Sequence, residues 1–159
     1  MILICYDGSS DSQTAIDQAG KLLGAKPATV LTVWVPFFEV IARTGAGLGF
    51  APGFDETDID AASEANAKAR SDEGAERARR AGLDAQSRTR AQTTTVAEAI
   101  IAEAADIEAS AIVIGSRGLT GLKSVLLGSV SHAVLQHADL PVIVVPSAEI
   151  ATARRACRS

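Results

Sequence analysis

The clearest chemical pattern in the chain lies between positions 115 and 129, where glycines are spaced as G-x2-G-x9-G and a serine follows. The residues concerned are Gly115, Gly118, Gly128 and Ser129. The run begins where the apolar segment 111–114 ends, and a helical pattern starts at its far end. A glycine-rich loop between a strand and a helix offers unencumbered backbone N–H groups and a positive helix end. This combination favours the binding of phosphate.

Two better-known phosphate motifs do not fit this sequence. A Walker A loop requires Gly-Lys followed by Ser or Thr, whereas Gly121 is followed by Leu122. The dinucleotide fingerprint G-x-G-x-x-G is also missing, because the glycines at 45, 47 and 49 do not match its spacing and do not follow a strand. The sequence therefore lacks the main motif that would indicate an enzyme using a dinucleotide cofactor for hydride transfer.

The elements that must position the loop are predicted from apolar runs and helical periods that alternate along the chain. We expect strands at residues 2–6, 28–35, 83–90, 111–114 and 142–145, and helices at 12–23, 58–81, 96–108 and 129–138. Residues 37–54, rich in glycine, are expected to form a long loop. The alternation predicts an α/β fold with a doubly wound, five-stranded parallel sheet and helices on both faces.

In such a sheet, ligands bind beyond the carboxyl ends of the strands, at the point where the strand order reverses. The strand ends that should meet there carry Asp7, Val33 and the start of the glycine loop. Asp7 before Gly-Ser is also typical of a turn or helix cap, and Val33 alone is typical of a core residue. His132 and His137 are five positions apart, which is typical of a helix surface rather than a site.

Composition narrows the class of protein. The chain has 159 residues, which suits one domain, and a formal net charge of −4, which disfavours a nucleic-acid partner. Its apolar runs are too short for a membrane helix or a signal peptide, so we expect no membrane partner and a cytoplasmic location. Cys5 and Cys157 form no disulfide framework or metal cluster.

At this point the chain resembles the universal stress protein family, in its ATP-binding branch. The resemblance rests on Asp-Gly-Ser after the first strand, Gly-Ser-Arg-Gly, Leu-Gly-Ser-Val-Ser and Pro-Val-Ile-Val-Val-Pro. It covers residues 1–146 as one domain, and residues 147–159 are left as a polar tail. It implies an adenine nucleotide alpha hydrolase-like fold, which is Rossmann-like, and the binding of ATP, with Mg²⁺ expected beside it.

The resemblance also implies roles for individual residues. A phosphate cradle is implied for Gly115, Gly118, Gly128 and Ser129, with a further hydroxyl donor from Ser116 and a backbone N–H from Val130. Arg117 and Lys123 would screen phosphate charge or remain surface cations. Asp7 would accept hydrogen bonds from the nucleoside, and the backbone of Val33 would meet the adenine edge.

These expectations lead to a regulatory ATP-binding protein that acts in a stress response as a homodimer. The dimer, which the resemblance implies, would pair Val142–Val145 with the same strand of a second chain, since an exposed apolar edge strand promotes aggregation. The competing interpretation is an enzyme, either a slow ATP hydrolase or a nucleotidyl-transferring enzyme of the same fold group. A third is a structural dimer with an empty pocket, which the intact glycine motif disfavours. The sequence does not decide whether ATP or AMP is bound, and it does not identify the pathway or the protein partner.

Overall fold

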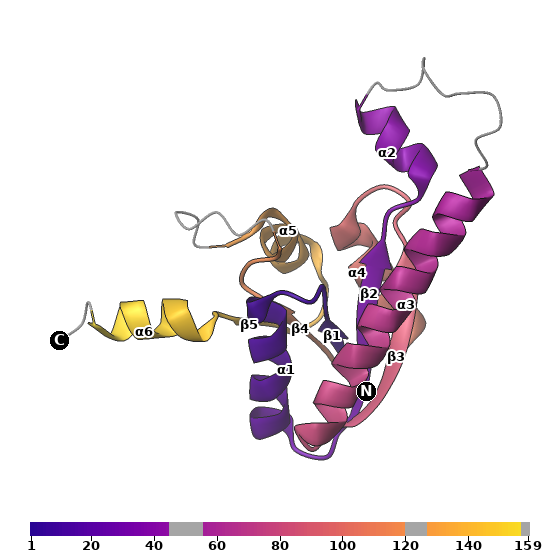
Figure 1. The fold of residues 1–159 in the computed structure, drawn as a ribbon. Helices are drawn as coiled ribbons and strands as arrows, with labels where there is room; N and C mark the ends of the chain where they lie inside the picture. The colour runs from indigo at the N-terminus through magenta and orange to yellow at the C-terminus, as the bar shows by residue number, and fades with distance from the viewer. Residues whose placement is uncertain (45–55, 120–126, 157–159) are drawn as a thin grey trace.

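The sheet is parallel throughout. A computed structural model of the protein describes residues 1–44, 56–119 and 127–156. The strands lie in the order β3-β2-β1-β4-β5 (Figure 1). Their bounds are β1 (Ile2–Cys5), β2 (Pro27–Trp34), β3 (Asp84–Ala91), β4 (Ala111–Gly115) and β5 (Val142–Val145). The predicted five-stranded α/β fold is therefore confirmed.

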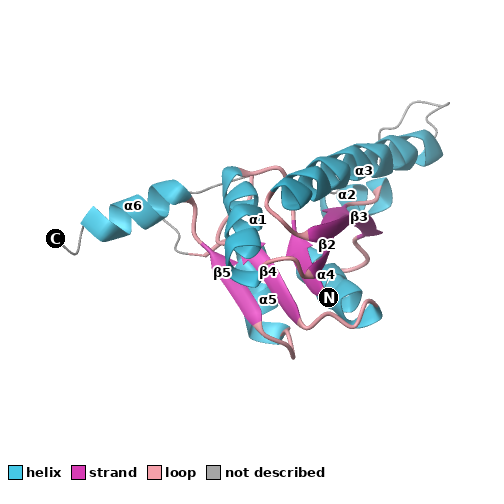
Figure 2. Cartoon of the chain, turned by 90° about the horizontal axis from the view of Figure 1, so that it is seen from below, coloured by secondary structure: helices cyan, strands magenta, loops and turns pink. Residues whose placement is uncertain are grey.

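Helices cover both faces of this sheet. The helices of the described residues are α1 (Ser10–Leu23), α2 (Phe37–Thr44), α3 (Glu56–Arg80), α4 (Val96–Asp106), α5 (Ser129–His137) and α6 (Ala148–Ala156). Helices α1 and α3 lie on one face, and α4 and α5 lie on the other (Figure 2). None of the helices in the described residues combines the length and the apolar composition that crossing a membrane requires.

Two apolar cores follow from the pleat of the strands. Ile2 and Ile4 point into the core under α1 and α3, and Leu3 and Cys5 point into the core on the opposite face. Successive strand residues face opposite sides of a sheet, so a strand covered on both sides must be apolar at every position. This is the physical reason why the first strand is a continuous apolar run.

The strand order reverses at β1. This strand pairs with β2 on one side, where Cys5 lies opposite Leu31, and with β4 on the other, where Ile4 lies opposite Val113. After β1 the chain continues toward β2, and after β4 it continues toward β5 on the other side. The two connections therefore separate and leave a crevice at the carboxyl ends of β1 and β4. The predicted site lies at this edge of the sheet.

Two segments differ from the prediction. Residues 37–44 of the expected loop form α2, whose first N–H, from Phe37, donates to Asp60 Oδ1 at 2.6 Å; residues 45–54 lie outside the described residues. The expected polar tail contains α6, where the N–H of Ile150 donates to Ser147 Oγ at 3.3 Å. In both cases a side-chain acceptor holds the first helical turn, and α6 extends away from the sheet (Figure 1).

Candidate functional site

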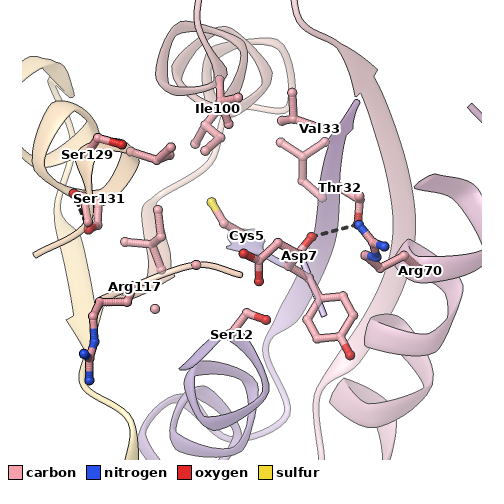
Figure 3. A pocket seen from close by; sticks show the side chains of 18 residues that line it. Cys5, Asp7, Ser12, Thr32, Val33, Arg70, Ile100, Arg117, Ser129 and Ser131 are labelled. Atoms are coloured by element: carbon pink, nitrogen blue, oxygen red, sulfur yellow. Dashed lines mark hydrogen bonds between the residues drawn. The ribbon is translucent and has the colours of Figure 1, made fainter. Parts of the chain in front are cut away.

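A cleft of about 180 Å³ opens at the carboxyl edge of the sheet, where β1, β2 and β4 end (Figure 3). Helices α1, α3, α4 and α5 and the loops after β1 and β4 contribute the remaining walls. The cleft is lined by Cys5, Tyr6, Asp7, Ser12, Leu31, Thr32, Val33, Arg70, Val96, Ile100, Ile114, Gly115, Arg117, Gly118, Gly128, Ser129, Val130 and Ser131. The structure therefore brings together all the residues predicted to bind the nucleotide except Ser116, and Lys123 lies outside the described residues.

Asp7 joins the two loops that border the cleft. Its Oδ1 accepts a hydrogen bond from the N–H of Ser9 at 3.0 Å, and its Oδ2 accepts one from the N–H of Leu119 at 3.2 Å. A carboxylate has about four lone-pair sites, so these two bonds leave acceptor capacity for a ligand. Asp7 is thus both the turn residue that its sequence context suggests and a half-buried acceptor in the cleft.

A Cβ would meet close neighbours at two glycines of the loop, backbone atoms at Gly115 and the end of a side chain at Gly118. A Cβ on Gly115 would lie 2.8 Å from the carbonyl carbon of Asp11 and 3.0 Å from the backbone nitrogen of Ser12. A Cβ on Gly118 would lie 2.8 Å from Asp7 Oδ2. These glycines therefore allow β4 to approach α1 and the loop to approach Asp7.

The amino end of α5 faces the cleft without a side-chain cap. The cap position is Gly128, which has no side chain to accept from the first turn. The first N–H groups of a helix have no partner within the helix, and they carry the positive end of its dipole. The N–H of Gly128 itself donates to the carbonyl of Ser116 at 2.7 Å, and the first intrahelical bond is that of His132, so the remaining donors of the first turn are the N–H groups of Ser129, Val130 and Ser131.

Ser116 and Arg117 both donate to Asp11, and of the two only Arg117 lines the cleft. The Ser116 hydroxyl donates to Asp11 Oδ2 at 2.8 Å, and the Arg117 N–H donates to the same oxygen at 3.0 Å. The Arg117 guanidinium runs away from Asp7, and its Nε lies 4.0 Å from Asp11 Oδ2 (Figure 3). Asp11 therefore fixes the turn that begins the glycine loop.

The wall opposite the glycine loop is apolar. Leu31 and Val33 of β2 face Val96 and Ile100 of α4 across this part of the cleft. The Thr32 hydroxyl donates to the carbonyl of Tyr6 at 2.8 Å, which joins the ends of β1 and β2. One end of the cleft therefore offers apolar surface and the other offers backbone N–H groups.

Sequence reasoning missed several lining residues. Arg70 of α3 and Ile100 of α4 line the cleft, although the sequence analysis did not place them in the site. Ser131 lies one turn into α5, where its hydroxyl donates to the carbonyl of Ser116 at 2.9 Å. Helical periodicity separates buried from exposed faces, but it does not specify which strand end a face meets. Only Ser131 had a usable signal, since it belongs to the same Gly-Ser-Val-Ser run.

Cys5 forms part of the floor of the cleft and is a buried free thiol. Burial, followed by the nearby Asp7 carboxylate, raises the pKa of this thiol from 9.0 to about 12. The folded protein therefore keeps the thiol protonated at a pH where the unfolded chain ionises it. The stabilisation is complete below pH 9 and is lost as the pH rises toward 12.

We therefore expect the free energy of unfolding to decrease between pH 9 and pH 12, and to decrease less steeply in Cys5→Ala. Denaturant titrations at several pH values would measure both slopes. The Tyr6 hydroxyl, whose pKa is also raised to about 12, contributes to both proteins equally. Identical slopes for the wild type and Cys5→Ala would contradict the assignment.

The donor set of the cleft suits an anion with an apolar extension. Within residues 1–44, 56–119 and 127–156, no cluster of His, Cys, Asp and Glu side chains could hold a metal by itself. A phosphate at the start of α5 would meet N–H donors, and an aromatic base would contact the apolar wall of β2 and α4. The residues present therefore fit a nucleotide.

Comparison with known proteins agrees with this geometry. Residues 1–146 match the model of the universal stress protein family. The chain is 32% identical over 152 residues to universal stress protein YxiE of Bacillus subtilis, which covers 91% of this chain and 97% of that protein. Among solved structures, hypothetical protein MJ0577 has a TM-score of 0.70 at 24% identity, over 91% of this chain and 94% of the other.

Some of the similar structures contain ligands. A universal stress protein in complex with cAMP is 25% identical, with a TM-score of 0.62 over 92% of this chain and 97% of that one. More distant structures, at 22% and 16% identity, contain dAMP in the Archaeoglobus fulgidus protein and AMP in an Arabidopsis thaliana protein, with TM-scores of 0.58 and 0.62. They cover 91% and 95% of this chain, and 95% and 94% of their own chains.

Proposed function

The chain belongs to the universal stress protein family, and on that basis we propose that it is a regulatory protein that binds ATP in the cleft at the end of β1 and β4. The observation that carries the proposal is the uncapped start of α5, which faces the same cleft as Asp7 and the apolar wall. The adenine nucleotides in the related structures support the ligand class.

The phosphate end is proposed at Ser129 and Val130. Their backbone N–H groups lie in the first turn of α5, where the helix dipole adds positive potential. Gly115 and Gly118 keep the approach to these donors free of Cβ atoms. Mg²⁺ would enter with the triphosphate, since Mg²⁺ is commonly held by substrate phosphates and few protein ligands.

The nucleoside end is proposed between Asp7 and Val33. Val33 ends the apolar wall and is half-buried, so the flat face of a base would cover its side chain. Asp7 retains lone pairs for ribose or base N–H and O–H groups after its bonds to Ser9 and Leu119. A ligand would therefore extend from Val33 past Asp7 to the start of α5.

Equilibrium dialysis of the purified chain against ATP, ADP and AMP tests the proposal. We expect saturable binding of at least one of them at micromolar to millimolar concentration, with ATP bound most tightly. A mass spectrum of small molecules released from freshly purified protein would identify the nucleotide that it carries from the cell. Absence of binding by all three nucleotides would contradict the proposal.

The regulatory role is proposed because the described residues of the cleft supply positioning groups, and none of them is a recognisable general base beside the phosphate end. Binding of ATP would change the loop that starts at Gly118, and a protein partner would read that change. Release of ADP, AMP or phosphate well above background would instead favour the enzyme alternative. A cytoplasmic location belongs to the same proposal, and the free thiol of Cys5 suits a reducing compartment.

We also propose a homodimer through β5. This strand is an edge of the sheet, and its partner on the other side is β4. The carbonyls of Pro141 and Val145 accept from the N–H groups of Ile112 and Ser116 at 2.9 and 2.8 Å. Because alternate residues of a strand hydrogen-bond to opposite sides, Val144 directs its N–H away from β4.

Val144→Pro should therefore prevent the dimer and leave the fold intact, because proline is tolerated on an edge strand whose N–H faces outward. Val144→Thr keeps the N–H and is the matched control. Analytical ultracentrifugation should give a dimer for the wild type and Val144→Thr, and a monomer for Val144→Pro. A monomeric wild type at high concentration would contradict the proposed interface.

A further inference from the structure

Arg70 is a charged residue of the cleft to which the proposed function gives no role. It extends from α3 toward Asp7 and Thr32, on the side of the cleft opposite Ser129 (Figure 3). We propose that Arg70 is a specificity-determining residue that donates hydrogen bonds to the nucleoside of the bound ligand. This inference rests on the proposed nucleotide site and deepens it.

The first observation is that Arg70 has no bonding partner among the described residues. Other arginines of the described residues pair with carboxylates, among them Arg77 with Asp17 at 2.7 Å and Arg90 with Glu103 at 2.8 Å. Arg70 has no ion pair or hydrogen bond within residues 1–44, 56–119 and 127–156. None of its five N–H donors bonds to the described part of the chain, and they lie at the rim of the cleft.

The second observation is that the β1–α1 loop is shaped to receive this side chain. The Nε and Cδ of Arg70 lie 3.4 and 3.5 Å from the position that a Cβ on Gly8 would take. Gly8 also has a backbone φ of +84°, which residues other than glycine rarely adopt. The stem of Arg70 therefore rests on bare backbone, beside the residue proposed to contact the nucleoside.

The third observation concerns position. Phosphate donors lie at the start of α5, whereas Arg70 lies across the cleft with Asp7 and Thr32 (Figure 3). Asp7 accepts hydrogen bonds and Arg70 only donates them, so together they form an acceptor and a donor at the same end. Ring nitrogens and ribose oxygens of a nucleoside accept hydrogen bonds from a guanidinium. The pair therefore selects a nucleoside that presents donors and acceptors side by side.

Dissociation constants of the full chain for adenosine and AMP test the inference, with Arg70→Met as the variant. Methionine keeps an unbranched stem over Gly8 and removes the charge and the donors. We expect Arg70→Met to raise the dissociation constants for adenosine and for AMP by the same factor, about tenfold, because the lost hydrogen bond is to the nucleoside that both ligands contain. Arg80→Met, at the exposed far end of α3, should leave both constants unchanged.

Arg70→Lys separates charge from geometry. Lysine keeps the charge and loses the planar fork, so we expect binding to stay weakened at least fivefold. A loss for AMP without a loss for adenosine would place Arg70 on the phosphate and overturn the inference, and unchanged affinity for both would overturn it as well. Wild-type protein that binds neither compound would overturn the proposed function together with this inference. Thermal unfolding of each variant would establish that it is folded.

Discussion

Asp7→Ala should raise the dissociation constant for adenine nucleotides by about 10- to 100-fold, because hydrogen bonds to a charged group contribute roughly 1.5–3 kcal/mol. The substitution removes the acceptor for the nucleoside, and it also releases the N–H groups of Ser9 and Leu119. Isothermal titration calorimetry with AMP and ATP would measure the loss. AMP and ATP should be affected alike, since Asp7 is assigned to the nucleoside and not to the phosphates.

Two controls accompany the Asp7 experiment. Asp84→Ala removes an exposed carboxylate at the start of β3, at the opposite end of the sheet, and should leave binding unchanged. Asp7→Asn preserves size and one acceptor oxygen, so its affinity should lie between those of the wild type and Asp7→Ala. An Asp7→Ala protein that is folded and binds AMP with wild-type affinity would remove Asp7 from the site.

Gly115→Ala should lower both stability and affinity. The new Cβ would lie 2.8 Å from the carbonyl carbon of Asp11, and backbone atoms cannot move aside as a flexible side chain can. Overpacking of this kind costs about 1–3 kcal/mol of unfolding free energy. Displacement of Asp11 would also disturb the turn at Ser116 and Arg117, so we expect at least tenfold weaker ATP binding.

Gly128→Ala is the matched control for stability in the Gly115 experiment. Its Cβ would find its nearest neighbours at 3.5 Å, which is ordinary van der Waals contact. Urea titrations should therefore show a large shift of the unfolding midpoint for Gly115→Ala and a small one for Gly128→Ala. Equal shifts for the two variants would contradict the assignment of Gly115 as the contact between β4 and α1.

The strands and their order of appearance could be predicted because burial on both faces requires continuous apolar runs, as in β1 and β5. The meeting of Asp7, Val33 and Gly115 could also be predicted, since carboxyl ends of parallel strands share one edge of a sheet. These predictions depend on local pattern and topology. They do not depend on which helix face meets which residue.

Tertiary contacts decided the features that the sequence analysis missed. Helix α2 begins with a bond from Phe37 to Asp60, a residue 23 positions away, so the local glycine-rich composition was misleading. In the sequence, Asp11 and Arg70 look like ordinary helix residues. Asp11 gains its role because the end of β4 lies against it, and Arg70 gains its role because its side chain lies against the loop at Gly8. A single sequence specifies periodicity, but it does not specify these partners.

The central claim is that the start of α5 binds the phosphates while the apolar wall of β2 and α4 contacts the base. A crystal structure of the protein with ATP tests it most directly. We predict phosphate oxygens within hydrogen-bonding distance of the N–H groups of Ser129 and Val130, with the base beside Val33. A nucleotide bound elsewhere, or a cleft that stays empty at saturating ATP, would contradict the account.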